Sequence, residues 1–95
     1  MTDYADYGRR YGAAIADSFV LAAAGKDVPD EKIAEAVDWS LKRIAAESID
    51  LTFRRVPEAD VRVFQGQAVS GMYDRLREHG LAAAQAGAGG EPGMQ

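Results

Sequence analysis

The segment from Ile33 to Phe53 carries two apolar stripes instead of one. The first stripe follows the three- and four-residue steps of an α-helix and consists of Ile33, Val37, Leu41, Ile44, Ser48 and Leu51. The second stripe lies on nearly the opposite face and consists of Trp39, Ala46, Ile49 and Phe53. A helix that is apolar on two sides needs a cover on each side. Because the rest of so short a chain covers one side far more easily than two, the pattern predicts an oligomer.

The N-terminal segment has a single stripe at helical spacing, and it is rich in tyrosine. Its members are Tyr4, Tyr7, Tyr11, Ile15, Phe19 and Ala22. Gly8 and Gly12 lie beside the tyrosines. Each glycine costs about 1 kcal/mol relative to alanine inside a helix, but the missing side chain allows another backbone to approach closely. We therefore predict an amphipathic helix over about residues 3–24.

Two prolines mark the starts of two further helices. Pro29 is followed by Asp30 and Glu31, and Pro57 is followed by Glu58. Proline is tolerated at the start of a helix, and acidic residues in the first turn complement the positive end of the helix dipole. The last apolar stripe consists of Val61, Phe64, Ala68, Met72, Leu76 and His79. These features predict helices over about residues 29–54 and 58–79, joined by a tight corner.

Together these patterns predict an all-α fold. We expect a three-helix bundle, or a helical hairpin with a packed N-terminal helix, completed by homodimerisation. A chain of 95 residues forms a thin core, which also favours association. The single helical domain is expected over residues 1–85. Residues 86–95 are expected to form a flexible glycine-rich tail, because such a segment buries too little surface to offset its ordering entropy.

Charge and composition restrict the partners and the compartment. The net charge is −4, which disfavours nucleic-acid binding, since that binding depends on lysine and arginine neutralising phosphates. The chain has no cysteine, so disulfides and thiolate ligands are excluded. The N-terminus lacks the basic and apolar regions of a signal peptide, and no apolar run approaches the roughly 20 residues that span a bilayer. We therefore expect a cytoplasmic protein that does not bind membranes.

Patterns typical of catalysis or metal binding are weak. His79 is the single histidine, and its place in the last turn of a helix is explained by the helix dipole. The acidic side chains of the second helix alternate with basic ones at ion-pair spacing, such as Asp38 and Lys42. The glycines at positions 66 and 71 lack the lysine and the serine or threonine of a phosphate-binding loop. We expect no catalytic residue, no metal site and no cofactor, and hence no enzyme.

Two groups of residues are candidates for a protein interface. They are Trp39, Ile49 and Phe53 of the second helix and Tyr4, Tyr7 and Tyr11 of the first. Tyrosine buries a large ring while keeping its hydroxyl in water, which suits an interface. For the tyrosines, packing against the other two helices is an equally good interpretation. We predict a homodimer built on the face that carries the tryptophan and Phe53.

The sequence favours a small non-catalytic protein-interaction module. Such a module would be a regulator, inhibitor or adaptor that acts by binding a partner protein. Two alternatives stay open. One is a self-assembling structural protein, and the other is a carrier that holds a small ligand in the interior of the bundle.

Overall fold

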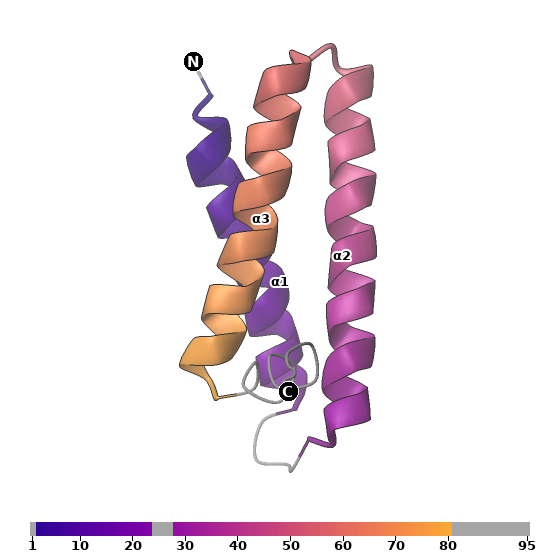
Figure 1. Ribbon diagram of the computed structural model, residues 1–95, viewed down its shortest axis with the longest axis vertical. Helices are drawn as coiled ribbons and strands as arrows, with labels where there is room; N and C mark the ends of the chain where they lie inside the picture. Colours follow the sequence, from indigo (N-terminus) through magenta and orange to yellow (C-terminus); the bar gives the residue numbers. More distant parts are fainter. Residues whose placement is uncertain (1, 24–27, 81–95) are drawn as a thin grey trace, which may run out of the picture.

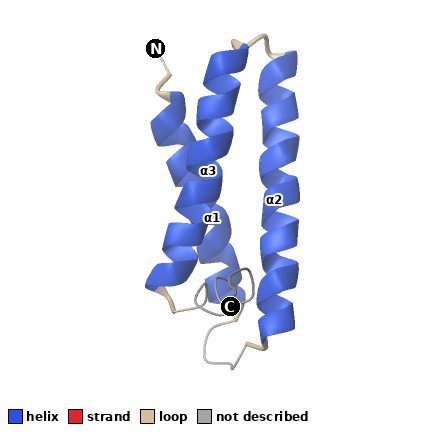
Figure 2. Cartoon of the chain, in the orientation of Figure 1, coloured by secondary structure: helices blue, strands red, loops and turns tan. Residues whose placement is uncertain are grey.

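The computed structural model describes residues 2–23 and 28–80. Within these ranges the chain forms three helices and no strand (Figures 1 and 2). The helices are α1 (Tyr4–Ala22), α2 (Asp30–Phe53) and α3 (Glu58–Glu78). The all-α fold with three helices is therefore confirmed. The helix end expected at position 24 and the tail expected over residues 86–95 lie outside the described residues.

The three helices lie side by side, with consecutive helices running in opposite directions (Figure 1). α1 and α3 consequently run the same way, and the contact between them is the most extensive among the three described helices. α2 packs mainly on α3 and touches α1 less. One long side of α2 thus stays outside the bundle, and this arrangement decides which apolar side chains are covered.

The start of each helix is fixed by side chains in or next to its first turn. The carboxylate of Asp3 accepts hydrogen bonds from the backbone N–H groups of Ala5 and Asp6, both at 3.1 Å, and so caps α1. α2 and α3 each follow a proline in an extended conformation, Pro29 and Pro57. Acidic residues occupy the first turn of both helices, where they complement the helix dipole.

The corner between α2 and α3 is closed by a Schellman motif. The N–H of Val56 donates to the carbonyl of Leu51 at 3.1 Å, and the N–H of Arg55 donates to the carbonyl of Thr52 at 3.0 Å. Arg55 holds the left-handed position of the motif, with φ of 66°. Glycine is the usual residue at this position. The corner is therefore tight because the last carbonyls of α2 are satisfied within it.

Two glycines of α1 bring its backbone into direct contact with α3. A Cβ on Gly12 would overlap the carbonyl oxygen of Ala68, and it would lie 2.8 Å from the Ala68 carbonyl carbon. A Cβ on Gly8 would overlap the carbonyl oxygen of Phe64 in the same way. The close approach expected at these glycines is thus present, and the backbone that approaches is that of α3.

The two glycines of α3 occupy different surroundings. A Cβ on Gly71 would lie 2.5 Å from the carbonyl oxygen of Arg9, so this glycine belongs to the same close contact between α1 and α3. A Cβ on Gly66 would meet nothing within 4 Å. Of these two glycines, only Gly71 lies where packing leaves no room for a Cβ atom.

The buried face of α2 differs from the predicted stripe at one position. The buried residues are Ile33, Val37, Ser40, Ile44, Ser48 and Leu51. Leu41, expected among them, is 37% exposed. The reason is angular, because at 100° per residue Ser40 lies nearer the centre of this stripe than Leu41 does. The two buried hydroxyls donate to carbonyls one turn earlier, Ser40 to Ala36 at 2.7 Å and Ser48 to Ile44 at 2.9 Å.

Candidate protein-interaction site

The outward face of α2 carries three large apolar side chains that the rest of the chain leaves uncovered. Trp39 is 50% exposed, Ile49 59% and Phe53 82%. They lie opposite the buried stripe of the same helix. Ile49 and Phe53 are one helical turn apart, whereas Trp39 lies about 15 Å from Ile49 along the axis. Ala46, between them, is also exposed. We call these four residues the outer α2 face.

Trp39 borders an open groove between α1 and α2. The groove has a volume of about 410 Å³ and is lined by Ser18, Phe19, Ala22, Lys32, Glu35, Ala36 and Trp39. Most of its wall is apolar. The guanidinium carbon of Arg43 lies 5.3 Å from the centroid of the Trp39 ring, within the range of a cation–π contact. The sequence pattern alone missed this groove, whose only local signal is small residues beside two aromatic ones.

The three tyrosines of α1 pack against the chain's own core. Tyr4, Tyr7 and Tyr11 are half-buried and contact the cluster that includes Phe64. The ring centroid of Phe64 lies 5.0 Å from that of Tyr7 and 5.4 Å from that of Tyr11. These distances are typical of aromatic pairs. The structure therefore places the two groups of candidate interface residues apart, one inside the bundle and the other on its outer side.

Tyr7 is also held by a polar contact with α2. Its hydroxyl donates a hydrogen bond to the carboxylate of Glu47. Burial, followed by this hydrogen bond and the negative charge of Glu47, raises the pKa of Tyr7 to about 12. The hydroxyl of Tyr11 donates to the backbone carbonyl of Arg43 at 3.4 Å. Tyr7 and Tyr11 thus join α1 to α2 through their hydroxyls and to α3 through their rings.

Replacing Tyr7 with phenylalanine is expected to lower the free energy of unfolding at pH 7 by about 1 kcal/mol. The ring is kept and one hydrogen bond to a partly exposed carboxylate is lost. The folded-state pKa lies above the unfolded value near 10, so folding favours the neutral hydroxyl. Its contribution is fully present below pH 10 and disappears as the pH rises toward 12.

Urea unfolding followed by circular dichroism at pH 7, 9.5 and 11 measures both effects. Tyr73→Phe on α3 is the matched control for removal of a tyrosine hydroxyl. The stability of Tyr7→Phe should fall less between pH 9.5 and pH 11 than that of the unchanged chain. An equal loss of stability between pH 9.5 and pH 11 in Tyr7→Phe and in the unchanged chain would contradict the role given to Tyr7.

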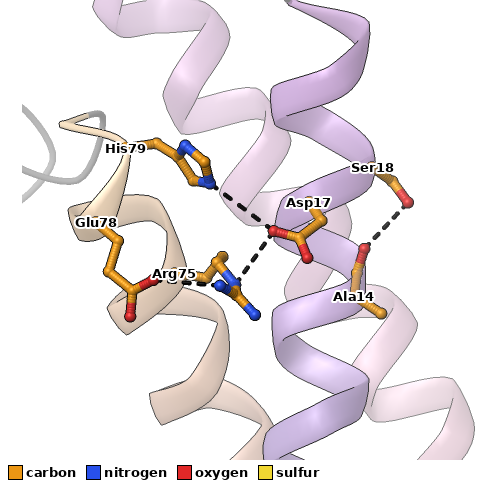
Figure 3. Close-up of polar contacts among 6 residues, drawn as sticks. All are labelled: Ala14, Asp17, Ser18, Arg75, Glu78 and His79. Carbon is orange, nitrogen blue, oxygen red and sulfur yellow. Dashed lines mark hydrogen bonds and ion pairs between the residues drawn. The ribbon is translucent and has the colours of Figure 1, made fainter.

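A polar cluster joins the C-terminal ends of α1 and α3 (Figure 3). Asp17 on α1 forms an ion pair with Arg75 on α3, with 3.2 Å between the carboxylate oxygen and Nε, and the Nε2 of His79 lies 3.9 Å from the same carboxylate oxygen. Arg75 also pairs with Glu78 at 3.2 Å. The hydroxyl of the neighbouring Ser18 donates to the carbonyl of Ala14 at 3.0 Å. The cluster is thus built as an ion-pair brace between two helices, and His79 is exposed at its edge.

Residues 2–23 and 28–80 contain no group of three or more side chains placed to hold a metal ion. No helix in the described part of the chain combines the length and the apolar character needed to cross a membrane. The chain matches no family model, no curated protein and no solved structure. On the described surface, the outer α2 face groups three of the exposed large apolar side chains, Trp39, Ile49 and Phe53.

Proposed function

We propose that this protein is a non-catalytic interaction module, of the regulator or adaptor kind, that works as a homodimer. The outer α2 face is the dimer interface. The observation that carries the proposal is the exposure of Trp39, Ile49 and Phe53 on a helix whose opposite face already forms the core. These side chains have no cover in the described part of their own chain, and tryptophan in particular is enriched among the residues that dominate binding energy.

The size of the apolar face is consistent with a stable pair. Complete burial of one such side chain contributes roughly 1.5–3 kcal/mol. A twofold interface uses the same patch on both copies, so each contribution counts twice. The gain from six partly exposed side chains is therefore comparable with the about 4–15 kcal/mol that association costs. A second copy is a suitable partner because it supplies an equal apolar face.

Size-exclusion chromatography with light scattering tests this proposal at micromolar concentration. We expect a dimer, and we expect Trp39→Ala to raise its Kd at least tenfold, which corresponds to about 1.4 kcal/mol. Circular dichroism should show that the variant keeps its helices. Val63→Ala is the matched control, because Val63 is 44% exposed on α3, away from the outer α2 face.

Two results would overturn the proposal. A clean monomer at micromolar concentration would remove the homodimer. Growth beyond a dimer as the concentration rises would instead indicate a self-assembling structural protein, because a closed twofold pair buries the outer α2 face completely and leaves none of it for a third copy.

A further inference from the structure

We infer the register of the homodimer: two copies of α2 pack antiparallel about a twofold axis at Ala46, and Phe53 of each copy enters the groove beside Trp39 of the other. This inference rests on the proposed homodimer and adds the site and the partner residue to it. It follows from the spacing of the outer α2 face, from the groove, and from the charges on either side of Ala46.

The spacing of the outer α2 face is symmetric. Trp39 and Phe53 each lie seven residues from Ala46, one before it and the other after it. Seven residues fall only about 20° short of two helical turns, so all three side chains project from nearly the same side of α2. An antiparallel partner centred on Ala46 therefore sets Trp39 of one copy level with Phe53 of the other. The small side chain of Ala46 permits a close approach of the two helices at the centre.

The groove gives Phe53 a place to bind. It has apolar walls made by Phe19 and Ala22 of α1 and by Ala36 and Trp39 of α2, and it is open to solvent. Phe53 is 82% exposed, more than any other large apolar side chain in the described part of the chain. In its own chain it lies about 21 Å from Trp39 along the helix, too far to reach the groove. An aromatic anchor that fills a pocket on the partner is the usual centre of a tight interface.

The charges beside Ala46 favour the antiparallel pair. Arg43 and Asp50 project from the same side of α2, three residues before Ala46 and four residues after it. The antiparallel register therefore places Arg43 of each copy beside Asp50 of the other. Asp50 forms an ion pair with Arg54 of its own helix at 2.8 Å, and a carboxylate has capacity for a further donor. Two equivalent ion pairs thus form across the axis.

A parallel pair through the same face lacks these contacts. It sets Trp39 against Trp39 and Phe53 against Phe53, so the groove stays empty. It also brings Arg43 of one copy next to Lys42 of the other, and like charges in contact are unfavourable. Charge and shape therefore both favour the antiparallel pair over the parallel pair.

Cysteine cross-linking tests the position of the axis. The chain has no cysteine, so Ala46→Cys introduces the only thiol. A residue on the axis faces its own copy, within the Cα separation of up to about 7 Å that a disulfide tolerates. Oxidation by air should convert Ala46→Cys to a covalent dimer at least ten times faster than Ala45→Cys. Ala45 is the matched control, since it is also an exposed alanine but points about 100° away.

Charge reversal tests the ion pairs independently. Arg43→Asp and Asp50→Arg should each raise the Kd of the dimer several-fold. The double variant restores opposite charges across the axis and should return the Kd to within about twofold of the original. If the double variant dimerises no more tightly than the single variants, Arg43 and Asp50 do not pair across the axis.

The outcomes separate the register from the proposed function. A dimer by light scattering in which Ala45→Cys cross-links as fast as Ala46→Cys overturns the register and leaves the homodimer standing. If the unchanged chain is a monomer, both the register and the homodimer are wrong. A monomer in which 1-anilinonaphthalene-8-sulfonate shifts the emission of Trp39, the single tryptophan, would assign the groove to a small apolar ligand and overturn the inference.

Discussion

Gly12→Ala is expected to lower the free energy of unfolding by at least about 3 kcal/mol and to leave much of the chain unfolded at 37 °C. The added methyl group would overlap the carbonyl oxygen of Ala68 on α3. This neighbour is backbone inside a continuous helix, so it cannot turn aside as a flexible side chain does. Overpacking of this kind costs about 1–3 kcal/mol even where the surroundings adjust. Here α1 must move away from α3, which weakens the most extensive helix contact.

Gly66→Ala is the matched control for this prediction. It makes the same chemical change inside a helix, but the new methyl group meets nothing within 4 Å. Alanine is favoured over glycine in helices by about 0.5–1 kcal/mol, so this variant should be more stable than the unchanged chain. Urea unfolding at one protein concentration measures both, because the proposed homodimer would make stability depend on concentration. A Gly12→Ala variant as stable as Gly66→Ala would contradict the close contact of α1 with α3.

Phe64→Ala is expected to lower the free energy of unfolding by about 3–5 kcal/mol. Phe64 is completely buried, and its ring contacts those of Tyr7 and Tyr11. The substitution removes the transfer free energy of the ring and leaves a cavity that the helices fill only in part. It also removes the surface on which the tyrosines of α1 rest. Thermal unfolding followed by circular dichroism gives the change in stability.

Phe53→Ala supplies the comparison for Phe64→Ala. Phe53 is mostly exposed, so in the monomer its replacement should change the stability by less than about 0.5 kcal/mol. The measurement must be made at a concentration at which light scattering shows a monomer, so that the proposed contact of Phe53 with a second copy is absent. Equal losses for the two phenylalanine variants in the monomer would show that the core is not centred on Phe64.

The position of the helices was predictable because the signals for them are local. Pro29 and Pro57 act on the turn that immediately follows them. The cap at Asp3 was not predicted, although it is equally local. The apolar steps of three and four residues repeat within each segment. The buried stripe of α2 was predicted correctly except at one position. The prediction included Leu41, whereas the structure buries Ser40. The Schellman motif at Arg55 gave no signal, because an arginine rarely takes the position that glycine prefers.

The tyrosine stripe shows where local patterns are insufficient. Its spacing indicated an inward face and an interface equally well, since tyrosine suits both. The choice depends on which helix lies next to α1. The glycines of α1 predicted a close neighbour without identifying it, and the structure supplies the matching residues on α3, Ala68 and Gly71. Once that contact forms, Tyr7 and Tyr11 are held over Phe64 inside the bundle.

By itself the sequence determined the helices and the two-sided character of α2, because periodicity and capping act over only a few residues. The tertiary structure decided which side of α2 is covered, since that depends on how α1 and α3 pack against it and not on α2 alone. It also created the groove beside Trp39, which needs two helices from different parts of the chain. Contacts between distant residues follow from the shape and volume of both partners, and a pattern within one segment contains only half of that information.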